Sequence, residues 1–301
     1  MHDTTVIVTG ANRGIGLEVA RGLAHRGARV VLACRDRGRG EDARGDLKED
    51  SGNSNLHVMQ VDLASPASIR AFGAAFSQRF DRLDVLVNNA GMFSTDRQET
   101  GEGFEATLAT NHLGPLLLSL ELLPSLRSAP TSRIVHVSSE AAWHATLDLD
   151  DLQMTRGYGR YGFDAYARSK LAQVYGVREL ARRLKGTGIT VNAVHPGHVA
   201  TNIYPDHRWW WRAVKWVQAR FALSPADAAV YCIRLACDAD VATVSGQFFS
   251  KETPVELPDS LRSEDVQQRL WADSLKLLDV DPKSVPDGSH PCSPDSGVGG
   301  V

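Results

Sequence analysis

The stretch "TVIVTGANRGIG", residues 5–16, places a short β-rich run directly before three glycines, Gly10, Gly14 and Gly16. This pattern predicts a strand, a tight turn and a helix start. Backbone N–H groups at a helix start are unpaired and the helix macrodipole is positive there, so glycines that let the backbone come close create an anion site. The stretch therefore favours binding of a nucleotide pyrophosphate. Its spacing is GxxxGxG, and the alternative is a tight turn that needs glycine without any ligand.

Similar runs recur along the chain and predict a parallel sheet. Helical patterns separate them, such as residues 16–27, which close with Gly27. Near-continuous Val, Ile and Leu match strands that are covered by helices on both faces. The five further runs lie at 28–34, 56–62, 83–89, 132–139 and 188–196.

The chain reads as a single domain over residues 1–281, because no repeat or linker interrupts it before about residue 250. Residues 282–301 are rich in Pro, Gly and Ser and predict a disordered tail. With 301 residues, 43% of them hydrophobic, the chain is long enough to bury a substantial core.

Composition excludes several functional classes. A net charge of -3 with scattered basic residues argues against nucleic acid as a partner. The four cysteines show no metal-ligand spacing, so we expect reduced thiols, an intracellular location and no metal site. No signal peptide and no apolar stretch of roughly 20 residues is evident. We therefore expect a soluble, cytoplasmic protein.

One segment is rich in tryptophan: "HRWWWRAVKWVQARF", residues 207–221. We interpret residues 203–224 as a helix that covers a hydrophobic substrate. The alternative is contact with a membrane interface through residues Trp209 to Trp216.

The residues after the second strand bear on the choice of cofactor. In "CRDRGRG", residues 34–40, Arg35 comes first and offers a bidentate fork for a 2′-phosphate, which Arg13 could join from the glycine loop. NADP is therefore favoured. Asp36 keeps NAD open as the alternative, because a carboxylate at this place can accept hydrogen bonds from the adenosine ribose.

Two polar residues close the next strands. Asp62 and Asn89 lie at carboxyl ends, where an open α/β sheet binds its ligand. Asp62 could accept from an adenine amino group or cap a helix, although Ser65 is the nearer candidate for the cap. Asn89, in "NNAG", could contact the cofactor or pin adjacent loops.

The motif "YARSK" places Tyr166 four residues before Lys170, on one face of a predicted helix. A phenol has a pKa near 10 and is a poor base at neutral pH, but a cation beside it favours the phenolate. Ser139, at the end of the fifth run, could hydrogen-bond a substrate oxygen on which charge develops. In "TNHLGP", Pro115 cannot donate to the Asn111 carbonyl, so we predict a local kink that frees this carbonyl to hold a water.

Six motifs together resemble the short-chain dehydrogenase/reductase family over residues 4–250: "TGANRGIG", "NNAG", "NH" with Asn111, "VSS", "YARSK" and "HPGHVAT". "ACR" after the second strand and "LDDLQ" before the tyrosine are similar to the retinol dehydrogenase branch. The resemblance implies a doubly wound α/β Rossmann fold in a single domain, with a seven-stranded parallel sheet and helices on both faces. It also implies alcohol dehydrogenase or carbonyl reductase activity.

The resemblance further implies a catalytic tetrad of Asn111, Ser139, Tyr166 and Lys170. Tyr166 would move the proton, Ser139 would polarise the carbonyl, Lys170 would hold the nicotinamide ribose, and Asn111 would anchor a water. Motifs and resemblance together give these expected cofactor contacts: Gly10, Arg13, Gly14, Ile15, Gly16, Arg35, Asp62, Leu63, Asn89, Ala90, Gly91, Tyr166, Lys170, Pro196, Gly197, Val199 and Thr201.

Two departures from the family pattern stand out. Ser139 and Tyr166 are 27 residues apart, about twice the usual gap, so residues 147–162 must loop out and should affect substrate shape more than catalysis. Membrane-bound relatives carry an N-terminal anchor that this sequence lacks, which again suggests a soluble enzyme. A homodimer through the helices that hold Asn111 and Tyr166 is neither demanded nor excluded.

The sequence therefore predicts an NADP(H)-dependent oxidoreductase that acts on a hydrophobic alcohol or carbonyl compound. The alternatives are an NAD-preferring dehydrogenase and a catalytically silent protein that senses NADP(H).

Overall fold

The computed structural model describes residues 1–197, 199 and 223–287, and the statements below concern these residues. Within this part of the chain, eight strands form one sheet. They are β1 (Thr5–Thr9), β2 (Arg29–Cys34), β3 (Leu56–Gln60), β4 (Val85–Asn88), β5 (Ser132–Val137), β6 (Ile189–His195), β7 (Phe248–Ser250) and β8 (Thr253–Val255).

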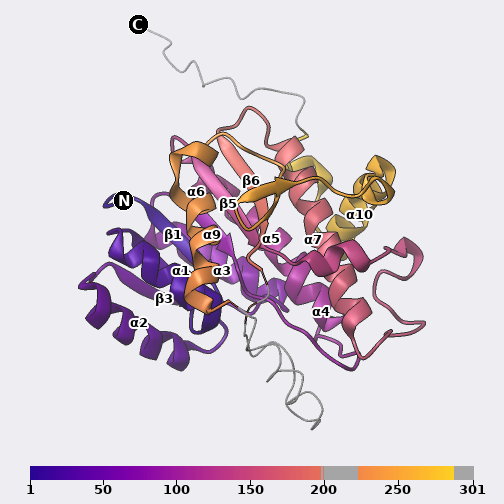
Figure 1. The fold of residues 1–301 in the computed structure, drawn as a ribbon, viewed down its shortest axis with the longest axis horizontal. Helices are drawn as coiled ribbons and strands as arrows, with labels where there is room; N and C mark the ends of the chain where they lie inside the picture. Colours follow the sequence, from indigo (N-terminus) through magenta and orange to yellow (C-terminus); the bar gives the residue numbers. More distant parts are fainter. Residues whose placement is uncertain (198, 200–222, 288–301) are drawn as a thin grey trace, which may run out of the picture.

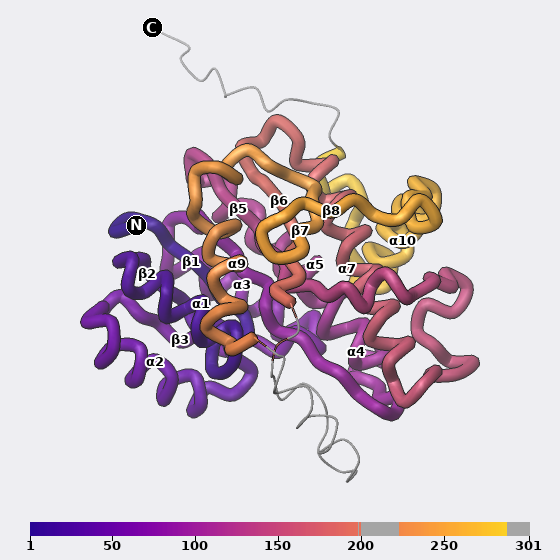
Figure 2. The backbone as a smooth tube through the Cα atoms, in the orientation of Figure 1, coloured from indigo at the N-terminus to yellow at the C-terminus, as the bar shows by residue number. Residues whose placement is uncertain are grey.

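The strands follow the order β3-β2-β1-β4-β5-β6-β7-β8, of which β5, β6, β7 and β8 can be followed in Figure 2. All neighbouring pairs are parallel except β7 and β8, which are antiparallel. The predicted doubly wound parallel sheet of seven strands is confirmed, and β8 adds an eighth that the sequence did not predict. The order reverses between β1 and β4, and ligands bind such sheets at the carboxyl ends of the strands beside the reversal.

Helices cover both faces of the sheet (Figure 1). One face carries α1, α2 and α9, and the other carries α3, α5 and α7, with α10 packed on α7. The helices are α1 (Gly14–His25), α2 (Arg37–Ser51), α3 (Pro66–Arg79), α4 (Ala106–Leu108), α5 (Gly114–Glu121), α6 (Leu123–Arg127), α7 (Phe163–Arg183), α9 (Pro225–Cys237) and α10 (Glu264–Leu277). Short 3₁₀ helices are η2 (Glu140–His144), η3 (Leu149–Asp151), η4 (Ala239–Val241), η5 (Asp259–Leu261) and η6 (Pro282–Ser284), and η1 (Ala109–Leu113) is a π-helical turn.

Strand β1 shows why the apolar runs are continuous. Val6 and Val8 pack with the residues of α1 and α9, whereas Ile7 packs on the opposite face. Successive side chains of a strand point to opposite faces. A strand covered on both faces is therefore apolar at every position.

Polar side chains fix the starts of the helices that follow β2 and β3. The Asp36 carboxylate accepts the Arg39 N–H at 3.1 Å, and Ser65 Oγ accepts the Ser68 N–H at 3.4 Å. Each bond satisfies an N–H group that has no partner inside the helix. The predicted cap at Ser65 is confirmed, and Asp36 is committed to α2.

The predicted boundary of the C-terminal tail at residue 282 is wrong. Pro282–Ser284 form η6, and Val285 is 5% exposed within the hydrophobic core. Val285 is apolar, so its burial against the core is favourable and attaches the chain beyond residue 282 to the domain. The rest of the expected tail, residues 288–301, lies outside the described residues.

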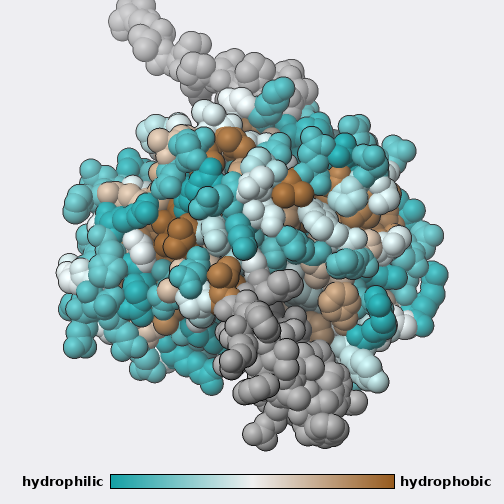
Figure 3. Space-filling view, viewed as in Figure 1, coloured by the Kyte–Doolittle hydropathy of each residue, from teal (hydrophilic) through white to brown (hydrophobic). Residues whose placement is uncertain are grey.

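The face of the molecule seen in Figure 3 is mainly hydrophilic, with small and separate hydrophobic patches. Among the described residues, no helix is both long enough and apolar enough to cross a membrane.

Candidate active site

The glycine loop joins β1 to α1 at the carboxyl edge of the sheet. Gly10 and Gly14 have φ angles of +66° and +58°, a left-handed backbone that favours glycine. Arg13 precedes α1, and its side chain does not cap the helix start. A Cβ at Gly14 would meet no atom within 4 Å, so the loop leaves room in front of the helix. An uncapped helix start with open space before it fits the pyrophosphate of a dinucleotide.

Gly16 is needed for close packing instead. A Cβ there would lie 2.3 Å from Asn89 Nδ2 and 2.6 Å from the Gly10 carbonyl oxygen. The Asn89 amide is held in this place because it donates to the Thr9 carbonyl oxygen at 2.8 Å. The backbone N–H groups of Asn89 and Ala90 both donate to Thr9 Oγ1. Asn89 thus pins the glycine loop to the end of β4, one of its two predicted roles, and its contact with a cofactor stays a prediction.

The chain after β4 passes close to two members of the predicted tetrad. A Cβ at Gly91 would lie 3.2 Å from Asn111 Oδ1 and 3.7 Å from Lys170 Nζ. Ile15, on the first turn of α1, is partly buried against the core. The motifs "TGANRGIG" and "NNAG" therefore meet beside the candidate catalytic residues.

The charged residues after β2 differ in whether their side chains are bonded to other parts of the protein. Arg35 and Arg13 are exposed, and neither guanidinium is paired with a carboxylate in the described part of the chain. Asp36 caps α2 and also lies 3.5 Å from Arg39. The carboxylate that could favour NAD is thus already bonded within the protein.

Asp62 and Leu63 follow β3. Asp62 Oδ1 accepts the Ala64 N–H at 3.0 Å, and the Asp62 N–H donates to Ser68 Oγ at 3.0 Å. Leu63 is buried, and its carbonyl oxygen fills the space that Gly114 leaves, since a Cβ there would lie 2.1 Å away. The turn is therefore rigidly held, and the contact of Asp62 with adenine stays a prediction.

Asn111 lies in the widened turn η1, between α4 and α5. The Gly114 N–H donates to the carbonyl of Ala109, five residues back. Pro115 has no N–H to donate to the Asn111 carbonyl. The predicted irregularity at Asn111 is present, as a π-helical turn in place of a kink, and such turns often mark functional sites.

Both polar atoms of the Asn111 side chain are hydrogen-bonded within the protein. Its Oδ1 accepts the Met92 N–H at 2.8 Å, and its Nδ2 donates to the Met92 carbonyl oxygen and to Ser169 Oγ, both at 2.9 Å. The side chain is 0% exposed. It therefore joins the loop after β4 to α7.

Tyr166 and Lys170 lie on the first turns of α7. Lys170 Nζ lies 5.8 Å from the centre of the Tyr166 ring, and the Tyr166 ring packs against Phe93 at 5.7 Å between centres. The ammonium donates to the Val137 carbonyl oxygen at 2.9 Å and to Gln173 Oε1 at 3.4 Å. Lys170 is 3% exposed, and burial lowers its pKa to about 8. A phenol and a cation thus lie together, as the sequence predicted.

Ser139 follows the end of β5. Its Oγ accepts the Ala141 N–H at 3.2 Å and begins η2, which packs against α7. Ser138 is buried at 5% exposure, whereas Ser139 is half-buried. Ser139 therefore stands at the strand end that faces the helix of Tyr166.

The motif "HPGHVAT" follows β6. Pro196 is buried, and Gly197 has a φ of +95°; a Cβ there would lie 2.9 Å from Leu223 Cδ1. Val199 forms an isolated parallel bridge with Leu223. The remaining predictions for this region, Thr201, the residues Trp209 to Trp216 and most of the segment 203–224, lie outside the described residues.

Several residues that build this site were not singled out from the sequence. Thr9 holds the residues after β4, Ser169 holds Asn111, and the carbonyl of Val137 holds Lys170. Thr9 immediately precedes the first glycine, and Ser169 immediately precedes Lys170, so both stand inside motifs that were recognised. Their partners are at least 33 residues away in the chain, and no local pattern reports such bonds.

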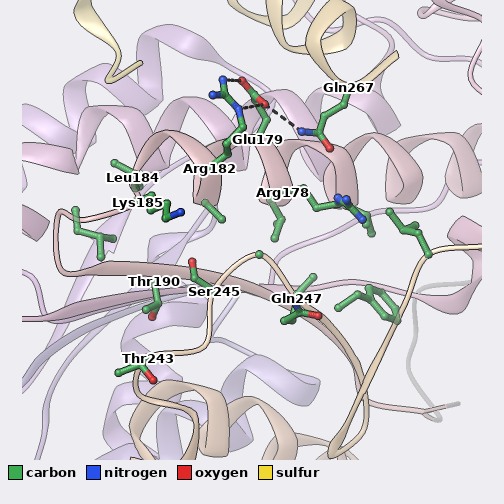
Figure 4. A pocket seen from close by; sticks show the side chains of 18 of the residues that line it. Arg178, Glu179, Arg182, Leu184, Lys185, Thr190, Thr243, Ser245, Gln247 and Gln267 are labelled. Atoms are coloured by element: carbon green, nitrogen blue, oxygen red, sulfur yellow. Dashed lines mark hydrogen bonds and ion pairs between the residues drawn. The ribbon is translucent and has the colours of Figure 1, made fainter. Parts of the chain in front are cut away.

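A cavity of about 870 Å³ lies elsewhere, between α7, α10 and the starts of β6 and β7. Figure 4 shows Thr190 and Gln247 on the strand side of this cavity. Glu179 bonds to Arg182 and Gln267 on the opposite side of α7, toward α10 (Figure 4). The amino ends of β6 and β7 line this cavity. The cavity is therefore separate from the candidate active site, which lies at the carboxyl ends of the strands.

Comparison with known proteins yields a consistent set of matches. The family model for short chain dehydrogenases matches residues 4–149. The Bos taurus protein named dehydrogenase/reductase SDR family member 13 is 42% identical over 287 residues, covering 94% of this chain and 75% of the relative. Retinol dehydrogenase 14 of Mus musculus is 41% identical over 296 residues, covering 93% and 87%. A crystal structure of an uncharacterized protein from Mycobacterium paratuberculosis has a TM-score of 0.73 at 31% identity, covering 93% and 94%.

The doubly wound fold and the glycine loop at its reversal are typical of proteins that bind a dinucleotide at the carboxyl ends of the strands. The comparisons agree with this class and narrow it. The chain belongs to the short-chain dehydrogenase/reductase family and is similar to its retinol dehydrogenases, so it is an oxidoreductase that acts on CH–OH groups.

Proposed function

We propose that the protein interconverts an alcohol with its aldehyde or ketone on a hydrophobic small molecule, using NADP(H). The observation that carries this proposal is the position of Tyr166 and Lys170. They lie on one face of α7, and the ammonium comes within reach of the chain after β4, which is bonded to the glycine loop. A proton-transfer group thus lies beside a dinucleotide site.

The cofactor-binding residues have distinct roles in this proposal. The start of α1 with Gly10 and Gly14 would hold the pyrophosphate, and Asp62 would contact the adenine. Arg35, with Arg13, would bind the 2′-phosphate, which is supported by the exposure of both guanidinium groups. When bound, NADP(H) would donate the hydride in reduction and accept it in oxidation, which is the chemistry of its nicotinamide ring. The remaining predicted contacts are Ile15, Gly16, Leu63, Asn89, Ala90, Gly91, Pro196, Gly197, Val199 and Thr201.

The tetrad handles the substrate oxygen. Tyr166 donates a proton to it in reduction and takes one from it in oxidation. Ser139 hydrogen-bonds the same oxygen while charge develops on it. Lys170 keeps a positive charge near the phenol and would reach the nicotinamide ribose, and the Asn111 carbonyl would hold a water that exchanges protons with solvent.

Three observations support the proposal that the substrate is hydrophobic. One relative bears the name retinol dehydrogenase 14, and the segment at 203–224 carries four of the six tryptophans. Phe93 supports this further, because its buried ring contacts the Tyr166 ring.

Turnover tests the proposal directly. Purified protein with NADPH and a panel of aromatic and long-chain aldehydes is expected to consume NADPH, followed at 340 nm. NADPH binding without consumption across the panel would favour a silent sensor. An enzyme that consumes only NADH would favour the NAD-preferring alternative.

The variant Arg35→Ala tests the cofactor choice. Loss of a charge-assisted bond of about 1.5–3 kcal/mol is expected to weaken NADPH binding roughly 10- to 100-fold and to leave NADH binding nearly unchanged. The matched control is Arg37→Ala, two residues on, where the side chain is 71% exposed and pairs with Glu41 at 4.0 Å. Dissociation constants from fluorescence titration give both values. If wild type binds NADH more tightly than NADPH, the assignment of Arg35 is wrong.

A further inference from the structure

The long segment between Ser139 and Tyr166 is bonded to the helix that carries Asn111. Its residue Tyr158 donates from the phenol oxygen to Glu105 Oε1 at 2.9 Å and lies 3.0 Å from Thr107 Oγ1. Its residue Gln153 accepts the Glu105 N–H at 2.8 Å through Oε1. The insertion thus bonds both the side chain and the backbone of one residue at the start of α4.

Glu105 is the N-cap of α4. Its two carboxylate oxygens accept the N–H groups of Thr107 and Leu108, at 2.8 and 2.6 Å. The side chain is 2% exposed. A buried carboxylate costs free energy unless hydrogen bonds replace its water, so the bond from Tyr158 is important to the cap. Burial, together with the nearby Glu105 carboxylate, raises the pKa of Tyr158 and keeps its phenol protonated as a donor.

This cap matters because α4 is the first turn of a longer helical segment. Its three residues, Ala106–Leu108, run directly into the π-helical turn that holds Asn111 and on into α5. The first N–H groups of a helix have no partner inside it and need other acceptors. The bonds at Glu105 therefore fix the start of a continuous helical segment in which Asn111 stands six residues later.

The insertion has hydrogen bonds of its own. The Asp151 carboxylate accepts the N–H groups of Thr155 and Arg156 at 2.7 and 3.0 Å. At its far end, Gly162 lies so close to the chain after β4 that a Cβ would be 1.7 Å from the Ser94 carbonyl oxygen. Tyr158 is thus presented to Glu105 from a fixed loop.

We propose that the insertion holds in place the helical segment that begins at Glu105 and carries Asn111. Tyr158 and Gln153 are positioning residues that act through Glu105 on Asn111. This inference rests on the proposed function and extends it, because it assigns the insertion a part in catalysis besides the shape of the substrate pocket.

The test is a double-mutant cycle between Tyr158→Phe and Asn111→Ser. Tyr158→Phe alone is expected to lower kcat roughly tenfold, within the roughly 100-fold that a misplacement of 1 Å can cause, with unchanged KM for NADPH. In the Asn111→Ser background, Tyr158→Phe is expected to have no further effect on kcat. Tyr161→Phe, a phenol of the same insertion with 59% exposure, is the matched control and should change neither value.

Two kinetic outcomes would overturn the inference. One is an unchanged kcat in Tyr158→Phe, and the other is a pair of effects that multiply fully in the double variant. Gln153→Met, which removes the acceptor of the Glu105 N–H, gives a second variant with the same expectations if Tyr158→Phe folds poorly. Hydrogen exchange of the Thr107 and Leu108 amides separates this inference from the proposed function. Faster exchange in the variants is expected even if the protein proves to have no turnover, and unchanged exchange contradicts the role of the insertion.

Discussion

The variant Tyr166→Phe is expected to bind NADPH as wild type does and to lose at least roughly 100-fold in kcat, the scale for losing a general acid or base. The ring contact with Phe93, at 5.7 Å between centres, does not need the hydroxyl, so the fold and the cofactor site should be retained. NADPH binding by fluorescence and single-turnover rates with the best aldehyde measure the two effects separately.

The control for this variant stands on the same helix. Tyr175→Phe removes a phenol hydroxyl from a side chain that is 3% exposed in the hydrophobic core. Its kcat should stay close to wild type. A Tyr166→Phe enzyme that turns over normally would remove this phenol from the mechanism, whatever the control shows.

The variant Lys170→Met is expected to have a kcat at least roughly 100-fold below that of wild type. Its free energy of unfolding at pH 7 is nevertheless expected to be higher. Burial lowers the Lys170 pKa from 10.5 to about 8. Keeping the ammonium protonated in the folded state therefore costs about 3 kcal/mol. Methionine removes this cost and loses the bonds to the Val137 carbonyl and to Gln173 Oε1, worth about 1 kcal/mol each, so a net gain of about 1 kcal/mol is expected.

The pH dependence gives the sharper measurement. Between pH 8 and 10.5 the unfolded chain keeps the Lys170 proton that the folded protein releases, so the contribution of Lys170 to the free energy of unfolding rises with pH in this window. Below pH 8 the full cost is present. The stability advantage of Lys170→Met should thus be constant below pH 8 and shrink above it, as followed by urea unfolding. An advantage that does not depend on pH would show that packing, not charge, causes it. Lys185→Met, at an exposed position near the end of α7, serves as the control and should show no such window.

The sequence predicted the features that arise from local patterns. The first six strands appear where the Val-, Ile- and Leu-rich runs stand, because burial on both faces demands apolar residues at every position. The glycine loop, the Ser65 cap and the irregular turn at Asn111 likewise follow from residues close together in the chain. Tyr166 and Lys170 meet because a helix brings residues four apart together.

The features that were missed depend on distant contacts or weak patterns. β8 has three residues and contains Pro254, which gives no strand signal. The hydrogen bonds from the Asn111 amide to Met92 and Ser169 join three separate segments of the chain, so they form only once the fold has placed these segments together. The bond between Tyr158 and Glu105 joins residues 53 apart, and neither is marked by a motif. Tertiary packing decides such bonds, and a linear pattern does not record it.

The proline in β8 also limits how copies of the protein can associate. Pro254 pairs with Phe249 at the last strand of the sheet, and it has no N–H with which to donate to a further strand. Outermost strands are the usual place where sheets of separate molecules join and aggregate. On this side of the sheet, the missing N–H opposes growth into an intermolecular sheet, so backbone pairing between two copies at β8 is not expected.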